Sequence, residues 1–144
     1  MRPSPARQRL GLHFATHPDR YITAEETAEF LRGLLRRLRG RVIVVWDGGS
    51  NHQGEPIRQL LRRHSRLSLE RLPAYAPQLN PVEALWAYLK YGQLANFVPK
   101  GVDHLDDIVV EHLLNTQLQP KLLKSIWKGS ELPLPTRCSG PSGQ

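Results

Sequence analysis

Cysteine is the scarcest reactive side chain in this sequence. The 144 residues include a single cysteine, Cys138, which stands in a stretch rich in proline, serine and glycine. One cysteine excludes a disulfide framework within the chain and a cysteine-based zinc site, because both require several thiols. We assign Cys138 no role.

Long apolar runs and acidic residues are also few. The longest apolar run, residues 42–46, is far shorter than a membrane-spanning helix, and the N-terminus lacks the apolar core of a signal peptide. These absences predict a cytoplasmic protein with no membrane span. Lys and Arg number 20 against 13 Asp and Glu, a formal charge of +7. This excess favours a polyanionic partner, either nucleic acid or an acidic membrane surface.

The composition predicts one folded region between two tails. Residues 1–9 and 129–144 are rich in proline, serine, glycine and charge, and bury too little apolar surface to order themselves. Residues 10–128 carry the apolar periodicity of a single domain. Within it we expect strands at 10–14, 42–46 and 67–72, and helices at 23–38, 56–64, 81–91, 104–118 and 121–127.

Local signals fix several of these elements. Thr23 and Glu26 have the spacing of a capping box at a helix start, and Gly40 stands where that helix should end. The β-branched run at 42–46 predicts a strand covered on both faces, as in a parallel α/β sheet. Asn80 followed by Pro81 predicts the start of a helix that buries Val82, Leu85 and Leu89.

Two acidic residues stand at chemically informative places. Asp47 directly follows the apolar strand, at the edge of the sheet where open α/β proteins assemble their sites, and two glycines after it leave room for a metal or phosphate. The alternative is that Asp47 only caps its turn. Glu83 is the third residue of the helix after Asn80, so it is either a ligand or the second half of a capping box.

Two motifs together carry a resemblance to a known family. They are WDGGSNH at residues 46–52 and LPAYAPQLNPVEALW at residues 72–86. In this order and separation they resemble the bacterial insertion-sequence transposases of the mariner superfamily, and the similarity extends over about residues 10–112. Asp47, His52 and Glu83 match the family's motif positions. The 35 residues between Asp47 and Glu83 are the separation expected between the second and third acids of an Asp-Asp-Glu (DDE) site.

The resemblance implies an α/β fold of the RNase H-like (integrase/transposase) type. It also implies that Asp47 and Glu83 are catalytic and bind Mg²⁺ or Mn²⁺, with two ions in a complete site. Asn80 and His52 have accessory roles on this view, although His52 can equally be a loop histidine that bonds the backbone. The implied partner is DNA, both transposon ends and target. A second partner is an upstream transposase segment or the full-length enzyme, as a dimer.

The sequence departs from the family upstream of Asp47. The family's first acid lies on an early strand, whereas the only earlier aspartate here, Asp19, lies in a turn-like stretch and is not given that role. We therefore expect a domain truncated at its N-terminal strands, either a degenerate fragment or a second reading frame. Such truncation exposes a sheet edge and part of the core, which predicts self-association.

Basic and aromatic residues supply weaker candidates. Phosphate contacts are expected from Arg58, Arg62, Arg63 and Lys90, together with Arg66, unless these side chains are simply solvated helix faces. Trp86 and Tyr88 are candidates for stacking on bases, or Trp86 belongs to the core. Three functions remain: a DNA-cutting enzyme, an inactive remnant that binds DNA or a full-length transposase, and an interaction domain with an accidental resemblance.

Overall fold

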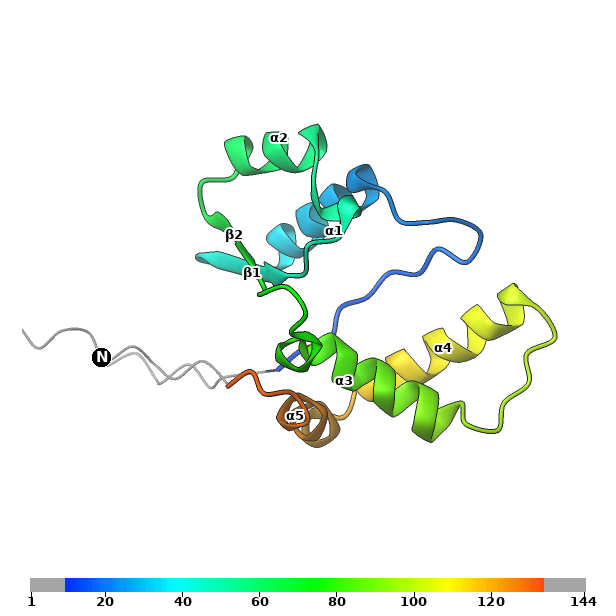
Figure 1. Cartoon of the computed structure of the whole chain (residues 1–144). Coiled ribbons are helices and arrows are strands. Elements are labelled where there is room, and N and C mark those ends of the chain that lie inside the picture. Colours follow the sequence, from blue (N-terminus) through cyan, green and yellow to red (C-terminus); the bar gives the residue numbers. More distant parts are fainter. Residues whose placement is uncertain (1–9, 134–144) are drawn as a thin grey trace, which may run out of the picture.

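The computed structural model describes residues 10–133 and has a mixed α/β architecture. The predicted tail at 1–9 and most of that at 129–144, with Cys138, lie outside the described residues. Within residues 10–133, two parallel strands and five α-helices follow one another (Figure 1). They are α1 (Ala24–Arg37), β1 (Val42–Trp46), α2 (Glu55–Arg63), β2 (Leu67–Arg71), α3 (Pro81–Ala87), α4 (Val102–Gln117) and α5 (Pro120–Lys128). None of the described helices is both long and apolar enough to cross a bilayer.

Short helical turns complete the chain. Two 3-10 turns, η1 (Ser50–His52) and η2 (Pro77–Leu79), precede α2 and α3, and a π-helix, η3 (Tyr88–Gln93), continues α3. The predicted helix at 81–91 is therefore two elements of different winding. The helices predicted at 104–118 and 121–127 are confirmed as α4 and α5, with ends shifted by one or two residues.

The predicted capping box at the start of α1 is confirmed. The Thr23 N–H donates to Glu26 Oε2 at 2.8 Å, and the Glu26 N–H donates to the Thr23 hydroxyl at 3.4 Å. Arg20 lies 2.6 Å from the same carboxylate. The hydrogen bond from the Thr23 backbone, followed by the charge of Arg20, lowers the pKa of Glu26 below its ordinary value.

The end of α1 is closed by an arginine from elsewhere in the chain. The Arg66 guanidinium donates to the carbonyls of Leu38 and Gly40, each at 2.9 Å, and to that of Leu35. Gly40 has a φ of +78°, which a glycine adopts without strain. Arg66 does not lie on a helix face as interpreted from the sequence: it follows α2, and it donates to carbonyls at and just beyond the end of α1.

The sheet has one covered face and one exposed face. In the parallel pair, Val42 lies beside Leu67 and Trp46 beside Arg71. Both α1 and α2 pack on the face that carries Val42, Val44 and Trp46. On the other face, Ile43 is 66% exposed and Val45 47% exposed. The prediction of a strand covered on both faces is therefore wrong, because the two helices share one side.

The predicted strand at 10–14 is also wrong. Leu12 and Phe14 pack instead against a second core, formed by Leu85, Leu89 and Leu113. The Leu12 carbonyl accepts a hydrogen bond from the Gln117 side chain of α4 at 2.6 Å. The sheet within residues 10–133 consists of β1 and β2, so this segment pairs with neither strand. Side-chain packing on helices holds the segment.

Burial on α3 also differs from expectation. Leu85 and Leu89 are buried as predicted, but Val82 is 49% exposed and Trp86 40% exposed. Contacts from α4 and α5 cover the Leu85 side of the helix, which leaves Val82 and Trp86 outside, while Tyr88 packs against the core. The interpretation of Val82 and Trp86 as core residues is wrong.

In the part of the chain that the structure describes, the buried apolar residues form two separate clusters, and we call the regions around them lobes. The first lobe contains α1, β1, α2 and β2 around one cluster; the second contains α3, α4 and α5, with residues 12–14, around the other. Residues 72–76 connect β2 to η2 and α3, and the lobes lie on either side of this connection (Figure 1).

Candidate active site

Asp47 is the first residue beyond β1, so the strand places it at the carboxyl edge of the sheet. Its Oδ1 accepts the Gly49 N–H at 3.0 Å, which is the turn-capping bond raised as an alternative from the sequence. The side chain nevertheless remains 61% exposed. Capping the turn therefore orients the carboxylate without burying it.

His52 holds Asp47 from the other side of the loop. Its Nδ1 lies 3.0 Å from Asp47 Oδ1 and 3.2 Å from the Asp47 carbonyl oxygen. Because a carbonyl oxygen can only accept, the hydrogen bond to it requires a proton on Nδ1. The imidazole also stacks on Trp46, with ring centroids 4.5 Å apart and planes within 3°. The last residue of the strand thus fixes the ring that contacts the carboxylate.

Glu83 lies in the first turn of α3, and it does not cap that helix. The Asn80 side chain accepts the Val82 N–H at 3.2 Å, which confirms Asn80 as the N-cap. The Asn80 N–H, however, donates to the Pro77 carbonyl at 3.0 Å. Because η2 already uses that donor, the capping box proposed for Glu83 is not formed, and the exposed Glu83 carboxylate can stabilise α3 only through the helix dipole.

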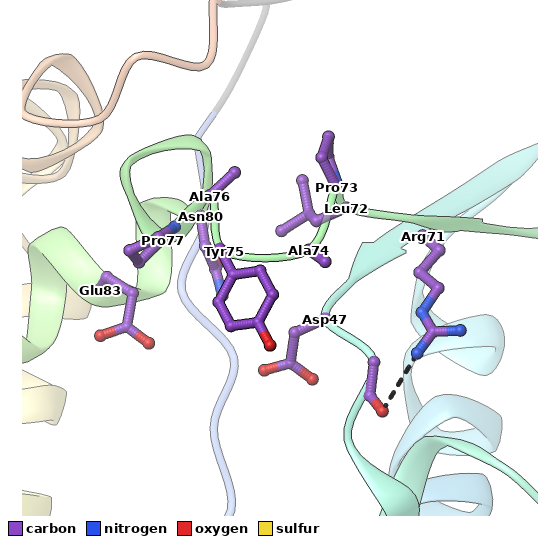
Figure 2. Close-up of a pocket in the computed structure, with 11 residues that line it drawn as sticks. Asp47, Arg71, Leu72, Pro73, Ala74, Tyr75, Ala76, Pro77, Asn80 and Glu83 are labelled. Carbon is purple, nitrogen blue, oxygen red and sulfur yellow. Dashed lines mark hydrogen bonds between the residues drawn. The ribbon is translucent and has the colours of Figure 1, made fainter.

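The two carboxylates line one cavity of about 640 Å³ between the lobes. Asp47 reaches it from the end of β1, Asn80 and Glu83 from the start of α3, and the connection at 72–77 forms its wall (Figure 2). Its volume is in the range of pockets that bind small molecules. Among residues 10–133 no cluster of three metal-binding side chains is present, and the cavity lining contributes two acids.

Arg71 and Tyr75 also line the cavity, and neither was predicted. Arg71 ends β2 beside Trp46, and its Nη2 lies 3.5 Å from the Gly48 carbonyl oxygen (Figure 2). A Cβ on Gly48 would overlap this guanidinium, so a glycine at position 48 leaves room for the Arg71 side chain. A prediction that β1 and β2 pair in parallel could have identified Arg71, because parallel strands end at the same edge of a sheet and Arg71 ends β2.

The remaining candidates lie away from the cavity. On α2, Arg58 pairs with Glu55 at 3.0 Å, and Arg62 pairs with the same carboxylate. The hydrogen bond from Arg62, and to a lesser extent the one from Arg58, lowers the pKa of Glu55. Arg63 and Lys90 are exposed on α2 and η3, and Asp19 lies in a turn. None of these residues lines the cavity, and neither His52, Trp86 nor Tyr88 does.

Asp47, at the carboxyl edge of the parallel strands, and Glu83, in the first turn of α3, offer carboxylate oxygens to one cavity, and such oxygens bind hard divalent cations. Residues 6–106 match the sequence profile described as DDE superfamily endonuclease. The match covers most of the chain, which therefore belongs to this family. No curated protein and no solved structure gave a match. The family acts on nucleic acid and typically uses divalent metal ions.

Proposed function

We propose that this chain is the part of an RNase H-like catalytic domain, at residues 10–128, that supplies two acids of the DDE site in a mariner-type insertion-sequence transposase. The observation that carries the proposal is the position of Asp47 and Glu83. They come from different lobes and from elements 35 residues apart, yet they line one cavity. The parallel β1–β2 pair with α2 as its crossover agrees with this fold.

The donor set suits hard divalent ions. Asp47 and Glu83 offer exposed carboxylate oxygens, which are the ligands that Mg²⁺ and Mn²⁺ prefer. When bound, two such ions supply the charge that makes an attacking oxygen more nucleophilic and stabilises a leaving oxygen at phosphorus. We assign the first acid of the DDE site, which precedes Asp47 in the family, to an upstream transposase segment or to a full-length transposase that pairs with this chain.

The chain's own residues would orient the site and the DNA. His52 and the Gly49 N–H both contact Oδ1 of Asp47. These contacts restrict rotation of the carboxylate at the cavity that it lines. Arg71 adds a positive charge at the cavity wall, suited to a phosphate of the DNA strand. Arg63 and Lys90 would add salt-dependent phosphate contacts outside the cavity, whereas Arg58 and Arg62 are already paired with Glu55.

The test is nicking of supercoiled plasmid in Mg²⁺ or Mn²⁺, with EDTA as the metal-free control. Asp47→Asn keeps an acceptor for the Gly49 N–H, and Glu83→Gln keeps the side-chain shape, so both variants should fold. Glu29→Gln, an exposed acid on α1 outside the cavity, is the matched control. With an upstream transposase segment added to supply the missing acid, we expect nicking by the wild type and by Glu29→Gln, and none by the two cavity variants.

Two results would contradict the proposal. If Asp47→Asn and Glu83→Gln nick as well as Glu29→Gln does, the cavity is not the reacting site. If the folded wild type binds DNA but does not nick it, even with an upstream transposase segment added, the chain is a remnant that only binds.

A further inference from the structure

Tyr75 has the least favourable backbone of any residue at the cavity. Its φ is +57°, and among residues 10–133 it is the one non-glycine residue with a positive φ. A side chain in this left-handed region is crowded by its own backbone, which destabilises the fold. Such strain persists only where the surrounding structure imposes it, and it is concentrated at functional sites.

The ring itself contributes nothing to the core. Tyr75 is 102% exposed, so its aromatic surface is fully in contact with solvent. Tyr75 in this conformation therefore does not stabilise the fold: its backbone is strained, and its ring gains no free energy from burial. Neither a hydrogen bond of its hydroxyl nor a packing contact is found for it among the described residues. Its position is not explained by stability.

The position is explained by what surrounds it. Figure 2 shows the Tyr75 ring projecting between the carboxylates of Asp47 and Glu83, and all three residues line the same cavity. The Arg71 guanidinium lies on the far side of Asp47 in the same view. The cavity therefore offers a flat aromatic face, two acids and one cation to a single ligand. A nucleotide unit has the matching parts, because it joins a flat base to an anionic phosphate.

We propose that Tyr75 is a stacking platform for an unpaired nucleobase next to the phosphodiester that Asp47 and Glu83 engage. The inference rests on the proposed function and narrows its substrate to a strand with an unstacked base at the reacting position. In an intact duplex both faces of a base are already stacked, so Tyr75 selects frayed, flipped or single-stranded DNA.

The test measures binding of a short oligonucleotide that carries the fluorescent base 2-aminopurine, whose emission falls when it stacks. Tyr75→Gly removes the ring and relieves the left-handed strain, so it should fold at least as well as the wild type. Tyr75→Phe keeps the ring. Tyr21→Gly is the matched control, because Tyr21 is 96% exposed, lies outside helices and strands, and does not line the cavity.

We expect Tyr75→Gly to weaken binding of the single strand roughly 5- to 150-fold, the range that loss of one base-stacking aromatic produces, and to abolish the quenching. Tyr75→Phe and Tyr21→Gly should both bind and quench as the wild type does. For a fully paired duplex, Tyr75→Gly should change the affinity much less.

Each other outcome overturns a definite statement. If Tyr75→Gly binds and quenches like Tyr21→Gly, while Asp47→Asn and Glu83→Gln still abolish nicking, the stacking inference is wrong and the proposed function stands. If single strand and duplex are weakened equally, the preference for an unpaired base is wrong. If the folded wild type binds neither DNA, both the inference and the proposed function fail.

Discussion

Glu83→Gln should separate function from stability at the start of α3. The substitution removes one negative charge from the first turn and leaves the two hydrogen bonds of Asn80 in place. An exposed acid near a helix N-terminus stabilises the helix by about 0.3–1 kcal/mol through the helix dipole. We therefore expect the free energy of unfolding to fall by no more than about 1 kcal/mol, with complete loss of metal-dependent nicking.

Asn80→Ala provides the comparison. It removes the acceptor of the Val82 N–H, and loss of such an N-cap typically costs about 1 kcal/mol, within a range of about 0.5–2 kcal/mol. The charge at this position is unchanged. We thus expect Asn80→Ala to lower stability more than Glu83→Gln does, although the proposed function makes cleavage depend on Glu83.

Urea unfolding followed by far-UV circular dichroism gives the two free energies, and plasmid nicking gives the activity. The reasoning is refuted if Glu83→Gln is the less stable of the two variants, because Glu83 would then make a structural contact that the described hydrogen bonds lack. Retained nicking by a well-folded Glu83→Gln would instead remove Glu83 from the site.

Three other substitutions test the fold itself. Arg66→Ala should lower the free energy of unfolding by about 1–3 kcal/mol, measured in urea, because the final carbonyls of α1 lose a charged donor. The pKa of Glu26 is lower in the folded state than in the unfolded state. The ionised Glu26 carboxylate therefore stabilises the fold above its unfolded pKa, and this stabilisation is lost as the pH falls through the folded pKa. The difference in Tm between wild type and Glu26→Gln should shrink toward zero in that acidic range. Changing Ile43 and Val45 to Thr should reduce self-association in sedimentation experiments without a large loss of stability, since both side chains are exposed.

Much of the secondary structure could be predicted because its signals are local. The capping box of Thr23 and Glu26, the N-cap at Asn80 and the bounds of β1 each depend on a few neighbouring residues. Burial could not be predicted in the same way. The exposure of Ile43 and Val45 depends on α1 and α2 sharing one face of the sheet, and an apolar run does not encode which side the helices take.

The site shows the same division. Asp47 and Glu83 were selected through motifs, and their roles remain predictions. Arg71 lies outside both motifs, and Tyr75 lies within the second motif but was given no role from the sequence. Arg71 lines the cavity because the parallel register sets it beside Trp46, and Tyr75 does so because of one residue's φ. Both depend on three-dimensional relations that spacing along the chain leaves undetermined.

The division of the core into two clusters has a thermodynamic consequence for the cavity between them. Each lobe has its own buried leucines, so in the free chain one lobe can open while the other stays folded. Asp47 belongs to the first lobe and Glu83 to the second. A ligand that engages both acids is lost when either lobe opens, and its binding free energy then opposes both events. Substrate or metal would thereby raise the free energy needed to open either lobe.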